Sequence, residues 1–294
     1  MAETARCVRV DHDRTSAYIG TLPVDLPAPG PDPDAHLTTG TREELAAFWL
    51  TLDAINFGSG WFPTLRKRDG RSGYYTVATG VRDRFAAEGP WTADELATID
   101  AHEIANTLGQ DPDHELMRLF TSSLNDLGQH VADDHGGRFA AVPDAAESSA
   151  VALVEGLATW DSFADTSRYD GLEVPFLKRA QIVAADLARS GVAAFRDLDR
   201  LTMFADNLVP HVLRVDALLS YDEELLDRID RGELIEHDSP EEIEIRACAL
   251  HTVELLTKQR AGALAADIDA LLWHRGQEAR YKAVPRHRSC CTAY

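Results

Sequence analysis

Apolar positions recur at the three- and four-residue spacing of α-helices along most of this chain. The spacing predicts helices near residues 114–134, 145–160, 178–190, 210–219, 222–231 and 263–275. Strand signals are few: SGYYTVA at 72–78 is one candidate and LEVPF at 172–176 is another. Pro175 has no amide hydrogen to give a neighbouring strand, which places the second candidate at a sheet edge.

Three further helices are predicted from their start signals. Thr41 and Glu44 have the spacing of a capping box, and Ala46, Leu50 and Ala54 continue one face after it. Thr92 begins a second capping box, with glutamate three residues later. In the run SPEEIEIRACALHTVELL, which begins at residue 239, a serine cap is followed by proline and two glutamates in the first turn, so a long helix is expected there.

The domain organisation follows from the same pattern. Residues 1–40 are rich in Pro, Gly and Asp, as in LPVDLPAPGPDPDAH, and are predicted to form an irregular arm. After residue 40 there is no repeat and no segment with the composition of a linker. The prediction is therefore a mainly α fold, with residues 41–294 forming a single helical domain that has at most a small β-sheet.

The net charge of the chain limits the classes of partner that it is expected to bind. The 294 residues include 49 acidic and 29 basic side chains, for a net charge of −20. Such a surface repels phosphodiester backbones and anionic lipid, so no nucleic-acid polymer and no membrane is expected as a partner, whereas a small-molecule ligand fits. The first twenty residues lack the apolar stretch of a signal peptide, and no later run is long enough to span a bilayer. We expect a soluble, cytoplasmic protein, and the sequence leaves its oligomeric state open.

Metal and cofactor motifs are weak. The HEIAN run at 102–106 has Asn106 where a zinc-binding helix needs its second histidine, so no metal site is expected. The sequence contains no P-loop, no GxGxxG after a strand and no GxSxG. The four cysteines, Cys7, Cys248, Cys290 and Cys291, fit neither a disulfide framework nor a CxxC metal pair, and are expected to be reduced and inert.

The stretch LTMFADNLVPHVLRVDALLSY places Asp206 among apolar residues, four positions before Pro210. Because Pro210 cannot donate to the carbonyl of residue 206 and biases Val209 away from the helical region, a helix should break or restart there. One interpretation is that Asp206 or Asn207 caps the helix that begins near the proline. The other is a desolvated carboxylate that faces a cleft.

Basic residues stand out against the acidic composition in two segments. Lys178 and Arg179 open the helix of FLKRAQIVAADL, and PRHRSCCTAY holds Arg286, His287 and Arg288. These cations could bind a phosphate. Alternatively, the lysine extends to solvent and the tail is a polar end.

Together these segments resemble the queuosine salvage proteins, the queuosine 5′-phosphate N-glycosylases. The resemblance covers nearly all of residues 41–294. Its strongest pieces are LEVPFLKRAQIVAADL, LTMFADNLVPHVLRVDALLSYDEELLDRIDRGEL, EEIEIRACALHTVELL and the terminal HR…Y, with weaker support from DAINFGSGW and FADTSRYDG. It implies a fold similar to helix-hairpin-helix DNA glycosylases, and hydrolysis of a nucleotide's N-glycosidic bond that frees the base for salvage.

The resemblance also implies site residues. Asp206 matches the family's catalytic aspartate and Lys178 its active-site lysine. The matched substrate-binding positions are Asn56, Phe57, Trp61, Asp165, Asn207, His287, Arg288 and Tyr294. A fixed carboxylate stabilises the positive charge that develops on ribose as the C1′–N bond breaks, and Asp206 would also orient or deprotonate water. Lys178 would hold the 5′-phosphate or a ribose oxygen, no cofactor is needed, and the acid that protonates the leaving base is not identified.

Some base-side positions differ from the family pattern. This chain has NFGSGW where an aromatic-rich run is usual, so a looser wall with Trp61 displaced is expected, and Asn207 stands at a position that is usually aromatic. Two alternatives therefore stay open: a glycosylase for a different modified purine nucleotide, and a non-catalytic nucleotide-binding homologue. DNA repair is disfavoured by the net charge.

Overall fold

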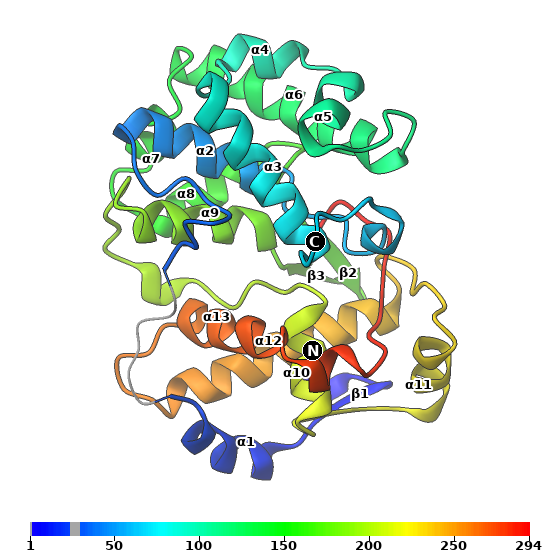
Figure 1. Ribbon diagram of the computed structural model, residues 1–294. Helices are drawn as coiled ribbons and strands as arrows, with labels where there is room; N and C mark the ends of the chain where they lie inside the picture. The colour runs from blue at the N-terminus through cyan, green and yellow to red at the C-terminus, as the bar shows by residue number, and fades with distance from the viewer. Residues whose placement is uncertain (1, 24–29) are drawn as a thin grey trace.

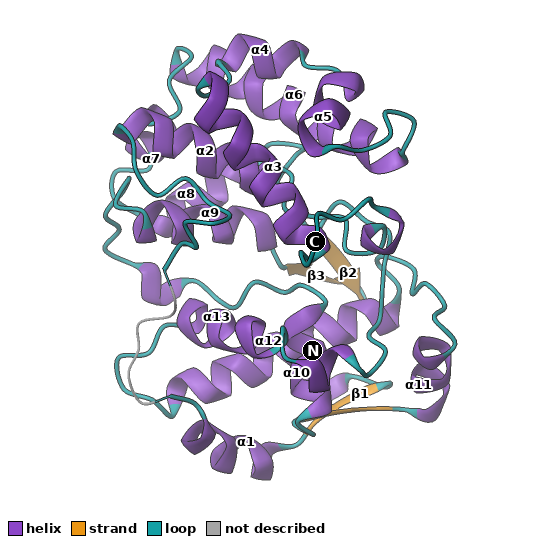
Figure 2. Ribbon diagram, in the orientation of Figure 1, coloured by secondary structure: helices purple, strands orange, loops and turns teal. Residues whose placement is uncertain are grey.

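The computed structural model describes residues 2–23 and 30–294, so residues 24–29 of the proline-rich stretch lie outside the described residues. The described chain is mainly helical, with short 3-10 turns and two small sheets (Figures 1 and 2). The α-helices are α1 (His12–Tyr18), α2 (Arg42–Ala54), α3 (Gly73–Glu88), α4 (Ala93–Thr98), α5 (Ala101–Leu108), α6 (Glu115–His135), α7 (Ala141–Ala145), α8 (Ala150–Leu157), α9 (Lys178–Arg189), α10 (Leu208–Val215), α11 (Glu223–Asp230), α12 (Pro240–Lys258), α13 (Ala265–Arg275) and α14 (Ala279–Lys282). The strands are β1 (Val8–Val10), β2 (Thr166–Tyr169), β3 (Leu172–Pro175) and β4 (Leu219–Tyr221).

The mainly α prediction is confirmed, and the helix start signals are confirmed in detail. Thr41 and Glu44 form a capping box at α2, and Thr92 with Glu95 forms one at α4. The Ser239 hydroxyl accepts a hydrogen bond from the Glu242 amide at the start of α12. Each cap satisfies an amide that has no partner inside the helix. These local signals held because they depend only on neighbours in the sequence.

The strand predicted at 72–78 is wrong. The Ser72 hydroxyl accepts a hydrogen bond from the Tyr75 amide and starts α3 instead. Thr76 and Val77 of this run are buried, and Tyr74 and Tyr75 are partly buried against the upper core, so tertiary contacts outweigh local β preference. The strand at 172–176 is confirmed as β3, which pairs antiparallel with β2 in a two-stranded sheet.

The prediction of an irregular arm over residues 1–40 is wrong for much of its described part. β1 pairs antiparallel with β4, with Val8 opposite Tyr221, and α1 follows. The fully buried Glu244 carboxylate holds this segment, because its Oε2 accepts hydrogen bonds from the amides of Arg6, Cys7 and Val8 at 2.9, 2.7 and 3.1 Å. The partner of the arm lies far along the chain, and its local composition gave no sign of it.

The helices surround two hydrophobic cores, one above the other in Figure 1. The upper core takes its residues from positions 35–201, including α2, α6, α8 and α9. The lower core is built mainly from α10, α12 and α13, together with β1 and β4. The chain's C-terminus lies at the level where the two halves meet (Figure 1). Whether residues 41–294 form one folding domain stays a prediction.

No helix among the described residues combines the length and the apolar character that crossing a bilayer requires.

We predict opposite effects for two glycine-to-alanine changes in helices of the upper half. A Cβ at Gly128 of α6 would lie 2.3 Å from the Ala97 backbone nitrogen of α4, so Gly128→Ala forces the two helices apart. Overpacking of this kind costs about 1–3 kcal/mol of unfolding free energy. Gly156 of α8 has no atom within 4 Å of the added Cβ, and Gly156→Ala should stabilise by about 0.5–1 kcal/mol because alanine is the better helix former.

Urea unfolding of both variants measures the difference. Equal effects at the two positions would show that the close approach of α4 and α6 is not a constraint on this fold.

Candidate functional site

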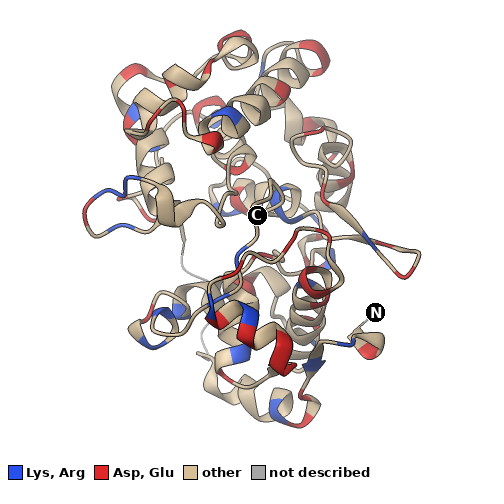
Figure 3. Ribbon diagram, turned by 90° about the vertical axis from the view of Figure 1, so that its right-hand side faces the viewer, with Lys and Arg blue, Asp and Glu red and all other residues tan. Residues whose placement is uncertain are grey.

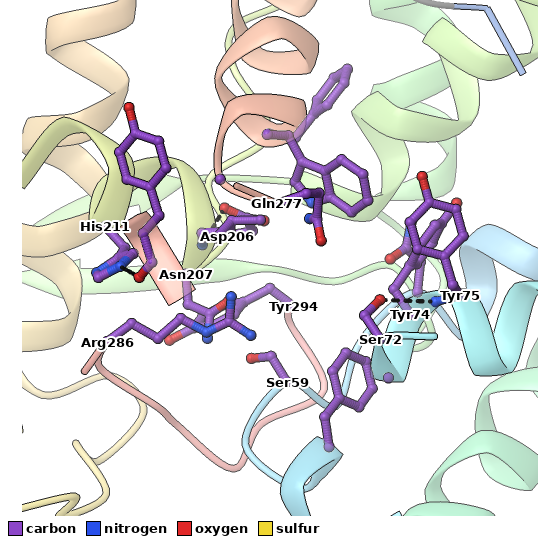
Figure 4. A pocket seen from close by; sticks show the side chains of 18 of the residues that line it. Ser59, Ser72, Tyr74, Tyr75, Asp206, Asn207, His211, Gln277, Arg286 and Tyr294 are labelled. Atoms are coloured by element: carbon purple, nitrogen blue, oxygen red, sulfur yellow. Dashed lines mark hydrogen bonds between the residues drawn. The ribbon is translucent and has the colours of Figure 1, made fainter. Parts of the chain in front are cut away.

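A cavity of about 800 Å³ lies between the two hydrophobic cores. Its lining comes from α3, α9, α13, the start of α10 and the C-terminal segment 284–294. Figure 4 shows Asp206 between His211 and Arg286 on one side and the Tyr74–Tyr75 pair on the other. The volume lies in the range of small-molecule sites and has room for a nucleotide.

Asp206 both caps a helix and lines the cavity. Its Oδ1 accepts hydrogen bonds from the amides of Leu208 and Val209, both at 2.9 Å, at the start of α10. Pro210 stands in the first turn, where a missing amide hydrogen costs nothing. Burial raises the pKa of the Asp206 carboxyl above its ordinary value, while Lys178 and the two amides oppose that rise. The two interpretations of the sequence therefore describe the same carboxylate.

Lys178 is the first residue of α9 and lines the same cavity. Its Nζ donates to the Asn56 carbonyl oxygen at 2.7 Å and lies 3.3 Å from the Asn56 Oδ1. Burial lowers the pKa of Lys178 to about 8, although the nearby Asp206 charge works in the opposite direction. The lysine thus faces the carboxylate inside the protein and does not extend to solvent.

Asp165 positions Lys178 and does not line the cavity. Its Oδ2 accepts a hydrogen bond from the Lys178 backbone amide at 3.0 Å. The same carboxylate forms a two-pronged ion pair with Arg246, at 3.0 and 2.7 Å. The expectation of a substrate-binding acid here is corrected: a carboxylate that carries three hydrogen bonds from the protein is committed to structure.

Arg246 of α12 was not predicted as part of this region. It is fully buried, its Nε donates to the Ala205 carbonyl at 2.9 Å, and its guanidinium lies over the rings of Phe176 and Tyr294. It therefore joins the segment that leads to Asp206, the segment that leads to Lys178 and the C-terminal segment. The available signal was an arginine inside the apolar run of α12, where a charge needs a partner.

Arg179 turns away from the cavity. Its guanidinium donates to the Ala54 carbonyl and to the Ser123 hydroxyl, and it lies over the Phe57 ring at 4.8 Å. It supports the wall that Asn56 and Phe57 form, so it is not available to bind a phosphate.

The NFGSGW segment is tightly packed, and the expected loose wall is wrong. A Cβ at Gly60 would lie 2.3 Å from the Ser289 carbonyl oxygen, so glycine allows this segment to contact the C-terminal one. Trp61 does not line the cavity. Its indole nitrogen donates to Glu115 at 2.9 Å, and a role for Trp61 in substrate binding stays a prediction.

An aromatic wall comes from elsewhere in the sequence. Trp273 of α13 contacts Tyr74 and Tyr75 of α3, with ring centroids 5.5 and 5.9 Å apart, and all three line the cavity. Sequence reasoning missed this wall, because 72–78 was interpreted as a strand and the two helices are far apart along the chain.

Only some residues of the C-terminal segment line the cavity. Arg286, Arg288 and Tyr294 line the cavity, and so does Asn207, whose side chain donates to the His287 carbonyl at 3.2 Å. His287 itself is buried and does not line the cavity; burial lowers the pKa of its imidazole to about 3. A substrate-binding role for the His287 ring is therefore not what the geometry indicates.

Five acidic residues besides Asp206 line the cavity, and none of them was indicated by the sequence: Asp32, Asp186, Asp230, Glu233 and Asp269. Asp230 and Glu233 are exposed, whereas Asp186 of α9 is partly buried and Asp269 of α13 is buried. Burial raises the pKa of the Asp186 and Asp269 carboxyls above the ordinary value, and for Asp269 the neighbouring Asp206 raises it further. Burial therefore raises the pKa of three of the acids that line the cavity, Asp186, Asp206 and Asp269.

One group of side chains among the described residues could hold a metal ion. His237, Asp238 and Glu242 bring possible ligand atoms within 4.8 Å of one another. The Glu242 Oε1 also lies 3.6 Å from the Arg246 guanidinium, which competes with a cation for that carboxylate. These three residues do not line the cavity.

The fold and site define a mainly helical protein with a nucleotide-sized cavity that holds a carboxylate and a lysine. The family model described as queuosine salvage protein matches residues 35–294. The chain belongs to this family. A protein of Sphaerobacter thermophilus named queuosine 5′-phosphate N-glycosylase/hydrolase is 35% identical, over 98% of this chain and 94% of its own. Proteins with the same name from Dictyostelium discoideum and Bos taurus are 31% and 30% identical, covering 90% and 87% of this chain and 83% of each relative.

We predict that Asp165→Asn lowers the free energy of unfolding by about 3–5 kcal/mol, because it leaves the Arg246 charge buried without its main partner. The matched control is Asp170→Asn, which breaks the exposed ion pair with Arg6 and should cost at most about 1 kcal/mol. Denaturant unfolding of the two variants provides the measurement. A loss at Asp165 as small as that at Asp170 would contradict the anchoring role of the buried pair.

Proposed function

We propose that this protein hydrolyses the N-glycosidic bond of queuosine 5′-phosphate and releases the free base. The observation that carries the proposal is the Asp206 carboxylate, fixed by two backbone amides beside Lys178 in the cavity. Membership of the family and the shared name of the relatives support the substrate.

Asp206 acts on the sugar. Breaking the C1′–N bond leaves positive charge on the ribose, and an anion that is already fixed in place stabilises this charge more than it stabilises the ground state. The amides of Leu208 and Val209 hold the carboxylate without reorganisation during the reaction. Asp206 also orients the attacking water and accepts its proton.

The basic side chains that line the cavity bind different parts of the nucleotide in this proposal. Lys178 is fixed on Asn56 close to Asp206, so a ribose oxygen is its natural partner. Arg286, which lies near Asp206 in Figure 4, and Arg288 both line the cavity. They are available for the 5′-phosphate, since guanidinium groups match phosphate geometry. The base then extends toward Trp273, Tyr74 and Tyr75, where aromatic rings can stack on it.

The partner in this proposal is a small nucleotide. Acidic positions are spread over both halves of the face shown in Figure 3, and the net charge of the chain is −20. Such a surface supports the proposal that neither a nucleic-acid polymer nor a membrane is bound. A cytoplasmic location stays a prediction.

Glycosylase activity on a different modified purine nucleotide is the second candidate. The observation that favours it is Asn207 at the cavity wall, in a position where the family usually has an aromatic residue. A panel of purine and 7-deazapurine nucleotides, assayed for free base, separates the two: a reaction with queuosine 5′-phosphate alone removes the second candidate.

We predict that wild-type protein releases the base from queuosine 5′-phosphate and that Asp206→Asn lowers kcat by at least about 10²–10³-fold, because the neutral amide no longer stabilises charge on the sugar. Chromatography of the free base is the measurement. The control is Asp199→Asn, the same change at an exposed residue seven positions earlier. A nucleotide that binds but is not cleaved by the wild type would identify a non-catalytic homologue.

We predict a pH profile with two limbs. Because the folded protein lowers the pKa of Lys178 to about 8, the protonated form that binds the ribose is lost as the pH rises through that value, and kcat/KM falls. The groups that act on this lysine are Asp206, Arg179, Asp53 and Asp269. On the acid side Asp206 must be ionised, and its raised pKa moves that limb above the range of an ordinary aspartate.

Lys178→Arg provides the comparison for this profile. Its guanidinium stays charged, so the limb near pH 8 should be absent from whatever activity remains. A wild-type profile that is level through pH 8 would contradict the assignment.

A further inference from the structure

The proposed hydrolysis leaves one group unassigned, the acid that gives a proton to the departing base. We propose that Asp269 is this acid and that the enzyme uses a pair of carboxyl groups: ionised Asp206 at the sugar and protonated Asp269 at the base. This inference rests on the proposed function and deepens it.

Asp269 is tied to the same short segment as Asp206. Its Oδ1 accepts a hydrogen bond from the Phe204 amide at 3.2 Å, and the Asp206 amide donates to the Phe204 carbonyl at 2.7 Å. Asp269 is 5% exposed and lines the cavity. Within the part of the chain that the structure describes, the Phe204 amide is its one hydrogen-bond donor, which leaves Oδ2 for a ligand.

The position of Asp269 along α13 suits contact with the base. Trp273 follows one helical turn later, and side chains four residues apart share a helix face. Trp273 belongs to the aromatic wall with Tyr74 and Tyr75. The carboxyl group is therefore close to the carboxylate assigned to the sugar and shares a helix face with Trp273 of the wall assigned to the base. In this binding mode the edge of the leaving base lies beside Asp269.

The surroundings raise the pKa of both carboxyl groups, and they raise that of Asp269 more. Asp206 accepts two amide hydrogen bonds and has Lys178 and Arg286 nearby, all of which favour its anion. Burial and the charge of Asp206 raise the pKa of Asp269 well above its usual range, against the opposing effects of the Phe204 amide, Arg189 and Lys178. Paired acids with separated pKa values are the arrangement by which carboxyl groups divide the acid and base roles.

Asp186, another cavity acid whose pKa is raised by burial, is the weaker candidate. Its Oδ1 lies 3.4 Å from an Arg189 guanidinium nitrogen on the same helix, and that cation favours the ionised form. A carboxylate paired in this way does not hold the proton that a general acid must give.

The proposed hydrolysis uses both carboxyl groups and one water molecule. The C1′–N bond breaks and its electron pair stays on the base, while Asp269 gives its carboxyl proton to an acceptor atom of the base. A 7-deazapurine has carbon in place of N7, so that atom is a nitrogen or the oxygen of the six-membered ring. Water adds to C1′ and passes one proton to Asp206. Return of that proton to Asp269, through solvent, restores both groups, and the net reaction consumes one water.

We predict that Asp269→Asn lowers kcat on queuosine 5′-phosphate by about 10²–10⁴-fold with little change in KM, because general acid catalysis contributes to this extent. The matched control is Asp267→Asn, two residues away on the same helix and outside the cavity lining. A second substrate, 4-nitrophenyl ribofuranoside 5′-phosphate, has a leaving group that needs no proton. On it Asp269→Asn should stay within about tenfold of the wild type, whereas Asp206→Asn should lose activity on both substrates.

An equal loss by Asp269→Asn on both substrates, or a loss confined to KM, would overturn the acid role. If that variant does not unfold cooperatively, the wild type decides: its kcat profile with queuosine 5′-phosphate should contain a deprotonation limb that is absent with the nitrophenyl substrate, and identical profiles would refute the proposal. Failure of the wild type to release the base would instead refute the proposed function.

Discussion

The buried Arg246 guanidinium is the interaction on which the rest of the site depends. It pairs with Asp165, donates to the Ala205 carbonyl and lies against the Tyr294 ring. Through these contacts one side chain fixes the start of α9, the segment before α10 and the C-terminal segment relative to one another. A buried charge tolerates few arrangements, since its partners must be close and correctly oriented. The two hydrophobic cores could tolerate small shifts that this ion pair does not.

The cavity brings two carboxyl groups close together, and small differences in their surroundings give them different pKa values. Asp206 has two amide donors and a nearby lysine, whereas Asp269 has one donor and an anionic neighbour. Two opposing effects act on the pKa of Lys178: burial lowers it, and the charge of Asp206 raises it. The chemistry proposed for this protein therefore depends on where backbone amides point, and those amides belong to the first turn of α10.

Much of the fold could be predicted because its signals are local. The caps at Thr41, Thr92 and Ser239 act within one helical turn, and the periodicity of the long helices follows from one-sided burial. The failures were at 72–78 and in the arm of residues 1–40. In both places the deciding contacts, α3 against the upper core and Glu244 with β4 around the arm, come from distant parts of the sequence.

By itself the sequence determined most of the helices, and its motifs indicated the Asp206–Lys178 pair. Only the tertiary structure decided which acids face a ligand. It turned Asp165 toward Arg246 and placed Asp269 in the cavity. The physical reason is that a carboxylate's role depends on the donors around it, and those donors come from helices that are far apart in the chain and meet only when the two cores pack together.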